Sequence, residues 1–333
     1  MSGRVLVIGD GGWGTALALA AHRAGNEVAV WSVDAAYAAE VAASRENRKF
    51  LPGVTIPREI AWLADAESAA RGATLALSVV PTQFVRATLG RFAGALRGVP
   101  VFSATKGLEL DTLLRPTEIL AACLGPEARR GAISGPSHAA ATARGAATSV
   151  VAACADEEVA GAVAERLGSA SLRLYTSADL PGVEYGGALK NIIAVGAGIA
   201  DGLGLGDNAK AALVARGLVE MARFGVAHGA QRETFFGLSG AGDLMVTCYS
   251  RHSRNRGLGE RIGRGETLEA ILASTEKVAE GVWTCKAIRR HAARAGVELP
   301  ITEAVHAVLF EGLPAPEAVR ALMQRPRRSE SLL

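Results

Sequence analysis

The sequence has few cysteines and no long apolar run. Its four cysteines, Cys123, Cys154, Cys248 and Cys285, form no C-x-x-C pair and have no histidine at metal-ligand spacing. We therefore expect reduced thiols, no disulfide and no structural zinc. No uninterrupted apolar stretch reaches the roughly 18–20 residues of a membrane span, and the first predicted strand begins too early to leave room for a signal peptide. These absences predict a cytoplasmic protein without stable membrane insertion.

The sequence also lacks a strong charge imbalance and is poor in lysine. The net charge of +3 is small for 333 residues, so nothing in it requires nucleic acid or a membrane surface as a partner. Only six of the 36 basic residues are lysines. A chain that prefers arginine for solvation tends to keep lysine where a titratable amine is needed, and this modest bias serves only to choose between otherwise equal interpretations.

A glycine-rich segment follows the first predicted strand. Gly9, Gly11 and Gly14 have G-x-G-x-x-G spacing, come directly after Val5–Ile8 and open a predicted helix over Trp13–Ala24. In this context Gly9 permits a tight turn, Gly11 lets the backbone approach a pyrophosphate, and Gly14 lets the helix pack close to its strand. The segment predicts a dinucleotide site, with a ligand-free glycine turn as the alternative.

Short apolar segments alternate with helical segments up to about residue 176. The predicted strands are 4–8, 27–31, 74–80, 99–103, 131–134, 147–152 and 171–175. This alternation predicts an α/β, Rossmann-type, doubly wound and largely parallel sheet, whereas the chain beyond residues 179–182 shows helical periodicity without convincing strands. We therefore predict a dinucleotide-binding domain over 1–180, an all-α substrate domain over 181–324 and a flexible tail over 325–333.

Three loops after predicted strands mix glycine or proline with small hydroxyl side chains: Val80–Gln83, Ser103–Glu109 and Ser134–Ala139. Ligands of open α/β sheets bind beyond the carboxyl ends of the strands, so together these loops are expected to line a site. Each loop alone is explained equally well as an ordinary turn. His138 by itself is interpreted as structural or solvent-facing.

The predicted helix over 183–200 places a lysine on an apolar face. Lys190 shares this face with small and apolar residues, namely Val183, Gly186, Gly187, Ile193, Ala194 and Ala197. Burial lowers the pKa of an amine toward the range useful for proton transfer unless a nearby carboxylate opposes the shift. Lys190 is thus the candidate catalytic residue, and a structural buried ion pair is the alternative. Its neighbour Asn191 points elsewhere, toward a ligand or neighbouring backbone.

Two later segments carry groups suited to an anionic ligand. Leu238–Leu244 supplies the carboxylate of Asp243 on a glycine-rich loop, and His252–Arg256 brings guanidinium, hydroxyl and amide groups together. Arginine offers a planar fork of donors, so the second segment fits a phosphate or a carboxylate. The alternative is the solvated, basic start of a helix.

In order along the chain, these motifs resemble those of bacterial NAD(P)-dependent glycerol-3-phosphate dehydrogenases: Gly9–Leu17, Leu51–Gly53, Ala104–Glu109, Ser134–Ser137, Leu189–Asn191, Gly240–Leu244, Ser253–Asn255 and Val278–Gly281. The resemblance spans essentially the whole chain. It implies NAD or NADP as cofactor, reversible reduction of dihydroxyacetone phosphate to sn-glycerol 3-phosphate for glycerophospholipid synthesis, and a homodimer.

The resemblance also implies roles for single residues, with Lys190 transferring the proton. The implied substrate-binding residues are Lys106, Gly135, Ser137, Asp243, Ser253, Arg254 and Asn255. The implied cofactor-binding residues are Gly12, Trp13, Lys106, Ala139, Arg254, Val278 and Glu280, together with Gly9, Gly11 and Gly14. No metal ion is implied. Negative charge grows on the ketone oxygen as hydride reaches the carbon, and Lys190 is suited to stabilise and protonate that oxygen.

The segment after the second predicted strand departs from the family pattern. Relatives often have a basic residue where this chain has Val33, and an arginine there accommodates the 2′-phosphate of NADP. Asp34 is interpreted as the N-cap of a helix over 35–43, with a bond to a ribose hydroxyl as the alternative. We expect NADH to serve at least as well as NADPH. Three basic residues could restore NADPH binding, Arg48 first: Arg45, Arg48 and Lys49.

Two other functions compete with this interpretation. A 3-hydroxyacid or ketopantoate-type reductase shares a Rossmann half, a helical half and a lysine on the helix that begins the second half. Its substrates lack phosphate, and the cluster Ser253–Asn255 with Lys106 favours a phosphorylated one. The second alternative is a non-enzymatic, dinucleotide-binding redox sensor. The presence of both Lys190 and Asp243 argues against it.

Overall fold

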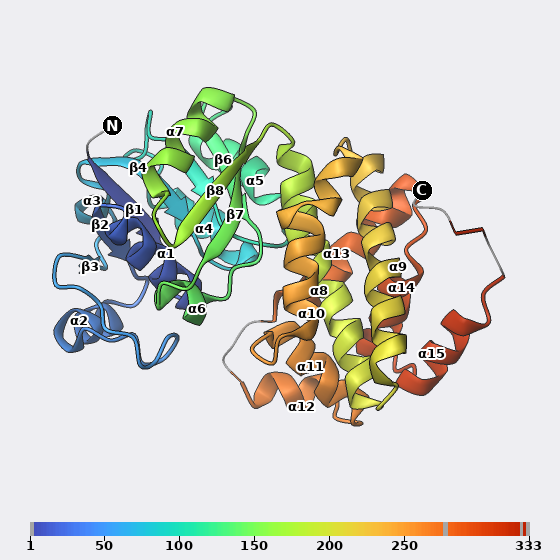
Figure 1. The fold of residues 1–333 in the computed structure, drawn as a ribbon. Coiled ribbons are helices and arrows are strands. Elements are labelled where there is room, and N and C mark those ends of the chain that lie inside the picture. Colours follow the sequence, from blue (N-terminus) through green and yellow to red (C-terminus); the bar gives the residue numbers. More distant parts are fainter. Residues whose placement is uncertain (1–2, 276–278, 327–328, 331–333) are drawn as a thin grey trace. The chain divides into compact units, whose positions relative to one another are not determined.

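The computed structural model describes residues 3–275, 279–326 and 329–330 of the chain (Figure 1). These residues form two compact units, which are described separately. The first comprises the chain up to Thr105 together with Pro116–Leu180, and the second comprises Lys106–Arg115 together with the chain from Pro181. The sequence-based division at residue 180 therefore differs from the structure in one segment. Of the predicted tail over 325–333, residues 327–328 and 331–333 lie outside the described residues.

The first unit is built on one eight-stranded sheet with the order β3-β2-β1-β4-β5-β6-β7-β8. Every neighbouring pair is parallel except β6 and β7, which are antiparallel. The strands are β1 (Arg4–Ile8), β2 (Glu27–Trp31), β3 (Ala61–Leu63), β4 (Ala73–Ser78), β5 (Val101–Ser103), β6 (Arg130–Ser134), β7 (Thr148–Cys154) and β8 (Leu172–Ser177). The predicted doubly wound sheet is thus confirmed.

The central strands are apolar on both faces. All four residues Val5–Ile8 of β1 are fully buried, as expected for a parallel strand that is covered on both sides. Edge strand β3 was not predicted, because three residues are too few to show an alternating pattern. The helices of this unit are α1 (Gly12–Arg23), α2 (Ala35–Ser44), α3 (Ala66–Ala70), η1 (Thr82–Phe84), α4 (Val85–Gly90), α5 (Pro116–Leu124), α6 (Ala139–Ala143) and α7 (Glu157–Leu167).

All regular elements in the described residues of the second unit are helices, as predicted. Its elements are α8 (Leu180–Gly202), α9 (Gly206–Ala227), η2 (Arg232–Phe236), the π-helical turn η3 (Leu238–Gly242), α10 (Asp243–Tyr249), α11 (Arg254–Gly263), α12 (Leu268–Ala273), α13 (Glu280–Ala295), α14 (Pro300–Phe310) and α15 (Ala315–Met323). Within the described part, no helix combines the length and apolarity needed to cross a bilayer.

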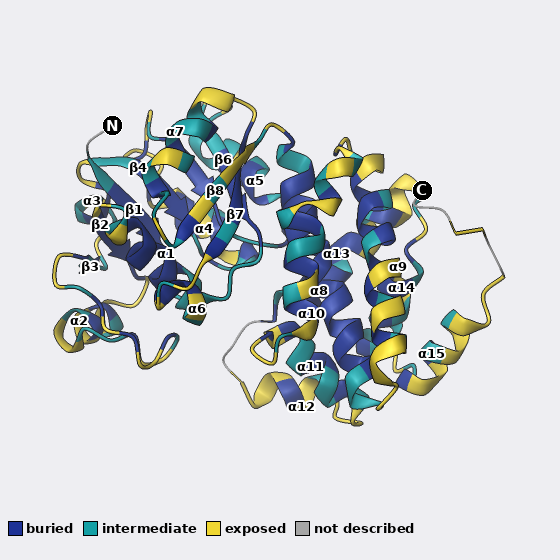
Figure 2. Ribbon diagram, viewed as in Figure 1, coloured by how far each residue is buried: buried dark blue, intermediate teal, exposed yellow. Residues whose placement is uncertain are grey.

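Helix α8 forms the centre of this unit and is buried along nearly its whole length (Figure 2). It packs closely on α11 through glycines. A Cβ on Gly198 would lie 2.0 Å from the carbonyl oxygen of Arg256, and one on Gly259 would lie 2.0 Å from that of Val195. This close approach fixes the start of α11, which carries the predicted anion-binding residues, relative to the helix that carries Lys190.

Segment Lys106–Arg115 belongs with the helical unit because three of its residues bond to it. Lys106 pairs with Asp243, Arg290 donates to the Leu110 carbonyl, and Arg115 pairs with Glu184 at 2.7 Å. The chain therefore leaves the sheet unit after β5 and returns to it at α5. Sequence periodicity detects no such excursion, since ten residues are too few to form a separate pattern.

Candidate active site

In the first unit, the glycine segment joins β1 to α1 in the way the sequence predicts. Gly9 has a φ of +114°, which L side chains rarely adopt, and a Cβ on Gly14 would lie 2.0 Å from the Gly9 carbonyl oxygen. Gly11 differs, because a Cβ there would have no atom within 4 Å. It is the N-cap of α1 and makes no side-chain cap bond. The space beside Gly11 is therefore open, as the approach of a pyrophosphate requires, whereas a Cβ on Gly12 would lie 2.8 Å from the Phe50 carbonyl oxygen.

Hydrogen bonds from the side chain of Asn47 stabilise the glycine segment. The sequence analysis did not single out this residue. The Asn47 amide donates to the Asp10 carbonyl and to Thr15 Oγ1, both at 2.7 Å, and its oxygen accepts from the Tyr37 hydroxyl at 2.6 Å. Asn47 is fully buried. These bonds fix the loop without a ligand. No local pattern could have identified Asn47, since the bonds to Asp10 and Thr15 span more than 30 residues.

The end of β2 carries Ser32, Val33 and Asp34. The Ser32 hydroxyl donates to the Asp10 carboxylate at 2.6 Å, and burial raises the pKa of Asp10. Val33 is 65% exposed. Asp34 accepts from the backbone N–H groups of Ala36 and Tyr37, both at 3.0 Å. The interpretation of Asp34 as the N-cap of α2 is confirmed, and its side chain is engaged in the cap.

The three basic residues considered for NADPH binding differ in what they contact. Arg45 donates to the carbonyls of Pro57 and Ile60, so its guanidinium is engaged within the protein. Arg48 is exposed and pairs with Glu46 at 3.1 Å. The Lys49 ammonium lies over the Phe50 ring, 5.4 Å from its centroid. Its charge only slightly opposes the rise in the pKa of Asp10 that burial causes.

The strand-end loops of the first unit meet one another. Thr105 donates its hydroxyl to the Val80 carbonyl at 2.7 Å, which joins the loops after β4 and β5. Gly135, after β6, has a φ of +144° and accepts from the Ser137 hydroxyl at 2.8 Å. Ala139 begins α6, which packs against α1, and its Cβ would lie 3.7 Å from a Cβ on Gly12. Two predicted cofactor residues from distant parts of the sequence are thus neighbours.

In the second unit, one carboxylate holds two lysines. Asp243, in the first turn of α10, accepts from Lys106 Nζ at 2.6 Å and from Lys190 Nζ at 3.0 Å, one lysine on each oxygen. Lys190 Nζ also lies 2.7 Å from Thr247 Oγ1. Lys190 and Asp243 are buried, as the helical face of Lys190 predicts. Thr247 was not predicted from the sequence. It lies four residues after Asp243, so the two side chains share one face of the helix, and this spacing could have identified it.

The charges of this cluster shift one another's protonation. Burial lowers the pKa of Lys190 to about 8, a shift that Asp243 opposes and Lys106 reinforces. Burial acts to raise the pKa of Asp243, but Lys106 and Lys190 outweigh it and hold this pKa below its ordinary value. Asp243 is therefore ionised at neutral pH. Lys190 titrates near the physiological range, as a proton donor and acceptor must.

Two asparagines connect this cluster to the starts of α11 and α13. Asn191 donates to the Lys106 carbonyl at 3.3 Å and accepts from the Asn255 amide at 2.8 Å. Asn255 in turn accepts from the backbone N–H of Gly281 at 2.9 Å. Asn191 thus bonds to backbone, the second of its two predicted roles, and also to a predicted substrate residue.

The predicted anion-binding residues lie at the start of α11. Ser253 is its N-cap and accepts from the Arg256 N–H at 3.2 Å. Arg254, at the first position of the helix, is exposed to solvent, yet the atoms packed around its guanidinium lower its pKa, and the Glu280 carboxylate opposes this shift. Val278 lies outside the described residues. The structure thus brings together Lys106, Lys190, Asp243 and, through the asparagines, the start of α11.

The comparison with known families agrees with both units. Residues 4–160 match the family model described as NAD-dependent glycerol-3-phosphate dehydrogenase N-terminus, and residues 179–320 match its C-terminus. The chain belongs to this family. It is an oxidoreductase that uses NAD or NADP and acts on a CH–OH group.

Curated relatives cover the whole chain. A glycerol-3-phosphate dehydrogenase [NAD(P)+] of Geobacter sulfurreducens is 47% identical over 99% of both chains. The crystal structure of a glycerol-3-phosphate dehydrogenase from Coxiella burnetii has a TM-score of 0.93 at 34% identity and covers 97% of this chain and 99% of its own. A ketopantoate reductase from Ralstonia eutropha has a TM-score of 0.60 at 16% identity, covering 95% and 99%, and shares the fold alone.

The first unit fits the dinucleotide that the family uses. The space beside Gly11 is open, the N-terminus of α1 has no side-chain cap, and Trp13 Nε1 is a buried donor without a hydrogen-bond partner in the described part of the chain. An anion at this position would receive backbone N–H groups and the positive end of the helix dipole.

Proposed function

We propose that the protein catalyses the reversible reduction of dihydroxyacetone phosphate to sn-glycerol 3-phosphate with NADH or NADPH, as the names of its relatives indicate. The observation that carries the proposal is that Asp243 binds two lysines, the buried Lys190 and the partly buried Lys106. Two ammonium groups on one carboxylate leave a net positive charge, which suits a substrate that is anionic and becomes more so as the carbonyl is reduced.

Lys190 is the proposed proton donor and acceptor. The bound nicotinamide supplies or accepts the hydride. An ammonium group has three N–H donors, and Asp243 and Thr247 engage two of those on Lys190, which leaves one for the substrate oxygen. Asp243 and Thr247 thereby orient the amine, and burial keeps its pKa low enough for it to release the proton.

The start of α11 is proposed to take the substrate phosphate. Arg254 is exposed there and offers a planar fork of donors, and Ser253 and Asn255 flank it. Asn255 is fixed by Asn191 and by the Gly281 N–H, so a second N–H of its amide is held in a defined direction. Roles for Gly135 and Ser137 in substrate binding rest on the family resemblance.

Gly9, Gly11, Gly12, Trp13 and Gly14 are proposed to hold the pyrophosphate of the cofactor. The open space beside Gly11 supports this assignment. Further cofactor contacts rest on the family resemblance: Lys106, Ala139, Arg254, Val278 and Glu280.

NADH is proposed to serve at least as well as NADPH. Val33 is exposed at the end of β2 and offers no charge to a 2′-phosphate, and Asp34 is a nearby anion. Of the residues considered for rescue, Arg45 is engaged with backbone carbonyls, Arg48 is exposed and pairs with Glu46, and Lys49 lies over the Phe50 ring. Arg48 therefore stays the first residue to change.

A single assay tests the proposal. Oxidation of NADH and NADPH is followed with dihydroxyacetone phosphate and, separately, with ketopantoate. Turnover with dihydroxyacetone phosphate alone supports the proposal, and turnover with ketopantoate alone contradicts it in favour of the other reductase. Binding of NADH without turnover on either substrate would support a redox sensor. A preference for NADPH above about tenfold, equivalent to about 1.4 kcal/mol, contradicts the cofactor proposal.

The resemblance further supports three proposals about the protein in the cell. These are a cytoplasmic location, assembly as a homodimer, and supply of sn-glycerol 3-phosphate for glycerophospholipid synthesis. Sedimentation equilibrium tests the dimer, since a single species at the mass of one chain would contradict it.

A further inference from the structure

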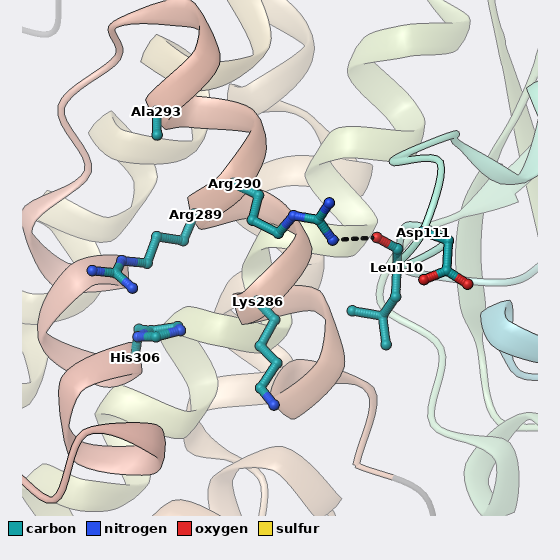
Figure 3. Close-up of a pocket in the computed structure, with 7 residues that line it drawn as sticks. All are labelled: Leu110, Asp111, Lys286, Arg289, Arg290, Ala293 and His306. Carbon is teal, nitrogen blue, oxygen red and sulfur yellow. Dashed lines mark hydrogen bonds between the residues drawn. The ribbon is translucent and has the colours of Figure 1, made fainter.

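A pocket of about 490 Å³ lies in the helical unit, against α13, α14 and segment Lys106–Arg115 (Figure 3). Three cations of α13, Lys286, Arg289 and Arg290, line it together with His306 of α14 and with Leu110 and Asp111. None of the residues proposed for the reaction is among its lining residues. Its volume is in the range of pockets that hold metabolite-sized ligands, roughly 300–1,000 Å³.

Two of the three cations have no carboxylate partner in the described part of the chain. Lys286 Nζ lies over the rings of Phe310, at 4.2 Å from the centroid, and Trp283, at 5.7 Å. Arg290 donates one N–H to the Leu110 carbonyl at 3.0 Å, and four of its five N–H groups have no partner among the described residues. Arg289 pairs with Glu311 at 2.9 Å.

The charges around the pocket favour an anion. Lys286, Arg289 and Arg290 outnumber the two carboxylates, Asp111 in the lining and Glu311 beside it. His306 adds no charge at neutral pH, because burial and then the charge of Arg289 lower its pKa from the ordinary value of 6.5. Asp111 makes no ion pair with these cations in the described residues, so it leaves their donors available.

The cations are spread around the pocket rather than gathered at one point. In Figure 3, Arg290 points toward Leu110, Arg289 points the opposite way and lies near His306, and Lys286 extends below both in this view. Because the three cationic groups point in different directions, they suit a ligand with more than one anionic group better than a single phosphate ion. Arginine forks match phosphate oxygens, and the lysine supplies a compact charge.

We propose that this pocket is a second anion site, separate from the reaction site, that binds a phosphorylated metabolite with two anionic groups through Lys286, Arg289 and Arg290. The apolar stems of these side chains and Leu110 provide contact surface for the organic part of the ligand. The proposal goes beyond the proposed reaction and does not depend on which substrate is reduced.

The test is calorimetric titration with inorganic pyrophosphate in the presence of saturating NAD⁺, which occupies the dinucleotide site. Wild-type protein is expected to bind pyrophosphate saturably. Lys286→Gln and Arg290→Gln should each weaken binding at least tenfold, which is about 1.4 kcal/mol. Lys286→Arg keeps the charge and should bind within about threefold of wild type. Inorganic phosphate should bind at least about tenfold more weakly than pyrophosphate.

Arg294→Gln is the matched control, because Arg294 is an exposed arginine of the same helix that does not line the pocket. Binding should be unchanged in this variant and in Arg254→Ala. Four outcomes would overturn the proposal: no saturation below about 10 mM pyrophosphate, equal loss in Arg294→Gln and Arg290→Gln, loss in Arg254→Ala, or equal affinity for phosphate and pyrophosphate. The melting temperature of each variant shows whether it is folded.

Discussion

At the scale of single residues, the site depends on Asp243. The structure contains the buried ion pair that was the alternative interpretation of Lys190, and the catalytic role of this lysine stays a prediction. Lys190 is paired with Asp243, yet burial outweighs this attraction and the pKa of the amine still falls to about 8. The ion pair therefore positions the lysine without preventing it from titrating.

Lys190→Ala is expected to lower turnover at least about 100-fold, the scale of lost general acid catalysis, with NADH affinity nearly unchanged. Lys190→Arg is the informative partner variant. It retains a positive charge next to Asp243 but cannot release a proton near neutral pH, so its turnover should also fall strongly. Steady-state kinetics with dihydroxyacetone phosphate measure both. Near-normal turnover in a folded Lys190→Arg protein would assign proton transfer to another group.

The pKa of Lys190 gives the reaction opposite pH dependences in its two directions. Oxidation of glycerol 3-phosphate needs the neutral amine, so kcat/KM should rise with pH and level off above about 8. Reduction needs the ammonium form, so kcat/KM should fall above the same pH. Measurements between pH 7 and 10 avoid the substrate phosphate, which titrates near pH 6. If both directions change with pH in the same sense, Lys190 is not the group that titrates.

Arg254→Ala is expected to raise the KM for dihydroxyacetone phosphate at least about tenfold. A charge-assisted hydrogen bond contributes about 1.5–3 kcal/mol, and Arg254 is proposed to provide one or two to the phosphate. Arg251→Ala is the control, since Arg251 is exposed three residues earlier and has no proposed role. An equal rise in KM in the two variants would indicate a general effect of positive charge rather than a contact with the phosphate.

At the scale of elements, the turn from β1 to α1 contains glycines of two kinds. Gly14 has no room for a side chain, because its Cβ would lie 2.0 Å from a backbone oxygen. Gly11 has room in the absence of a ligand and a φ of −61°, which any residue adopts. The same residue type thus serves packing at one position and ligand access at the other.

These two glycines should respond differently to alanine. Gly14→Ala is expected to destabilise the protein by more than about 2 kcal/mol through overpacking against backbone. Gly11→Ala should change stability by at most about 1 kcal/mol and weaken NADH binding at least tenfold, because its methyl group occupies the path of the pyrophosphate. Thermal unfolding and a fluorescence titration with NADH measure the two effects. Normal NADH affinity in Gly11→Ala would show that the pyrophosphate does not bind beside Gly11.

At the scale of the whole molecule, the helical unit depends on a buried carboxylate that has no ion pair in the described residues. Glu220 of α9 accepts from the backbone N–H groups of Ile301 and Thr302, at 2.5 and 3.2 Å, and so caps α14 from another helix. Burial raises its pKa from 4.5 to about 7 against these hydrogen bonds. Because the pKa of Glu220 is higher in the folded protein than in the unfolded chain, the unfolded chain loses this proton at a lower pH. The free energy of unfolding therefore falls as pH rises from about 4.5 to 7.

Glu220→Gln removes this titration. The stability of the variant relative to wild type should therefore increase by about 2–3 kcal/mol between pH 5 and pH 8, whatever its absolute value. Urea unfolding at a series of pH values measures the difference. Glu317→Gln, at an exposed position of α15, should show no such trend. A flat difference between Glu220→Gln and wild type would mean that Glu220 keeps an ordinary pKa.

The sequence by itself determined the features that depend on local spacing. The glycine segment, the cap at Asp34, the buried face of Lys190 and the change from alternating strands to helices are all patterns within about 20 residues, and the structure has each of them. Such patterns are readable because the periods of strands and helices, and the glycine positions, follow from backbone geometry.

Only the tertiary structure decided which distant groups meet. Asp243 joins lysines 137 and 53 residues away, Asn47 reaches back to Asp10, and Lys106–Arg115 leaves the sheet unit for the helical one. The pKa of Lys190 depends on these long-range contacts, because burial within the helical unit lowers it, Asp243 opposes that shift and Lys106 reinforces it. Burial and the distances between charges are set by tertiary contacts, so neither can be derived from the order of the residues alone.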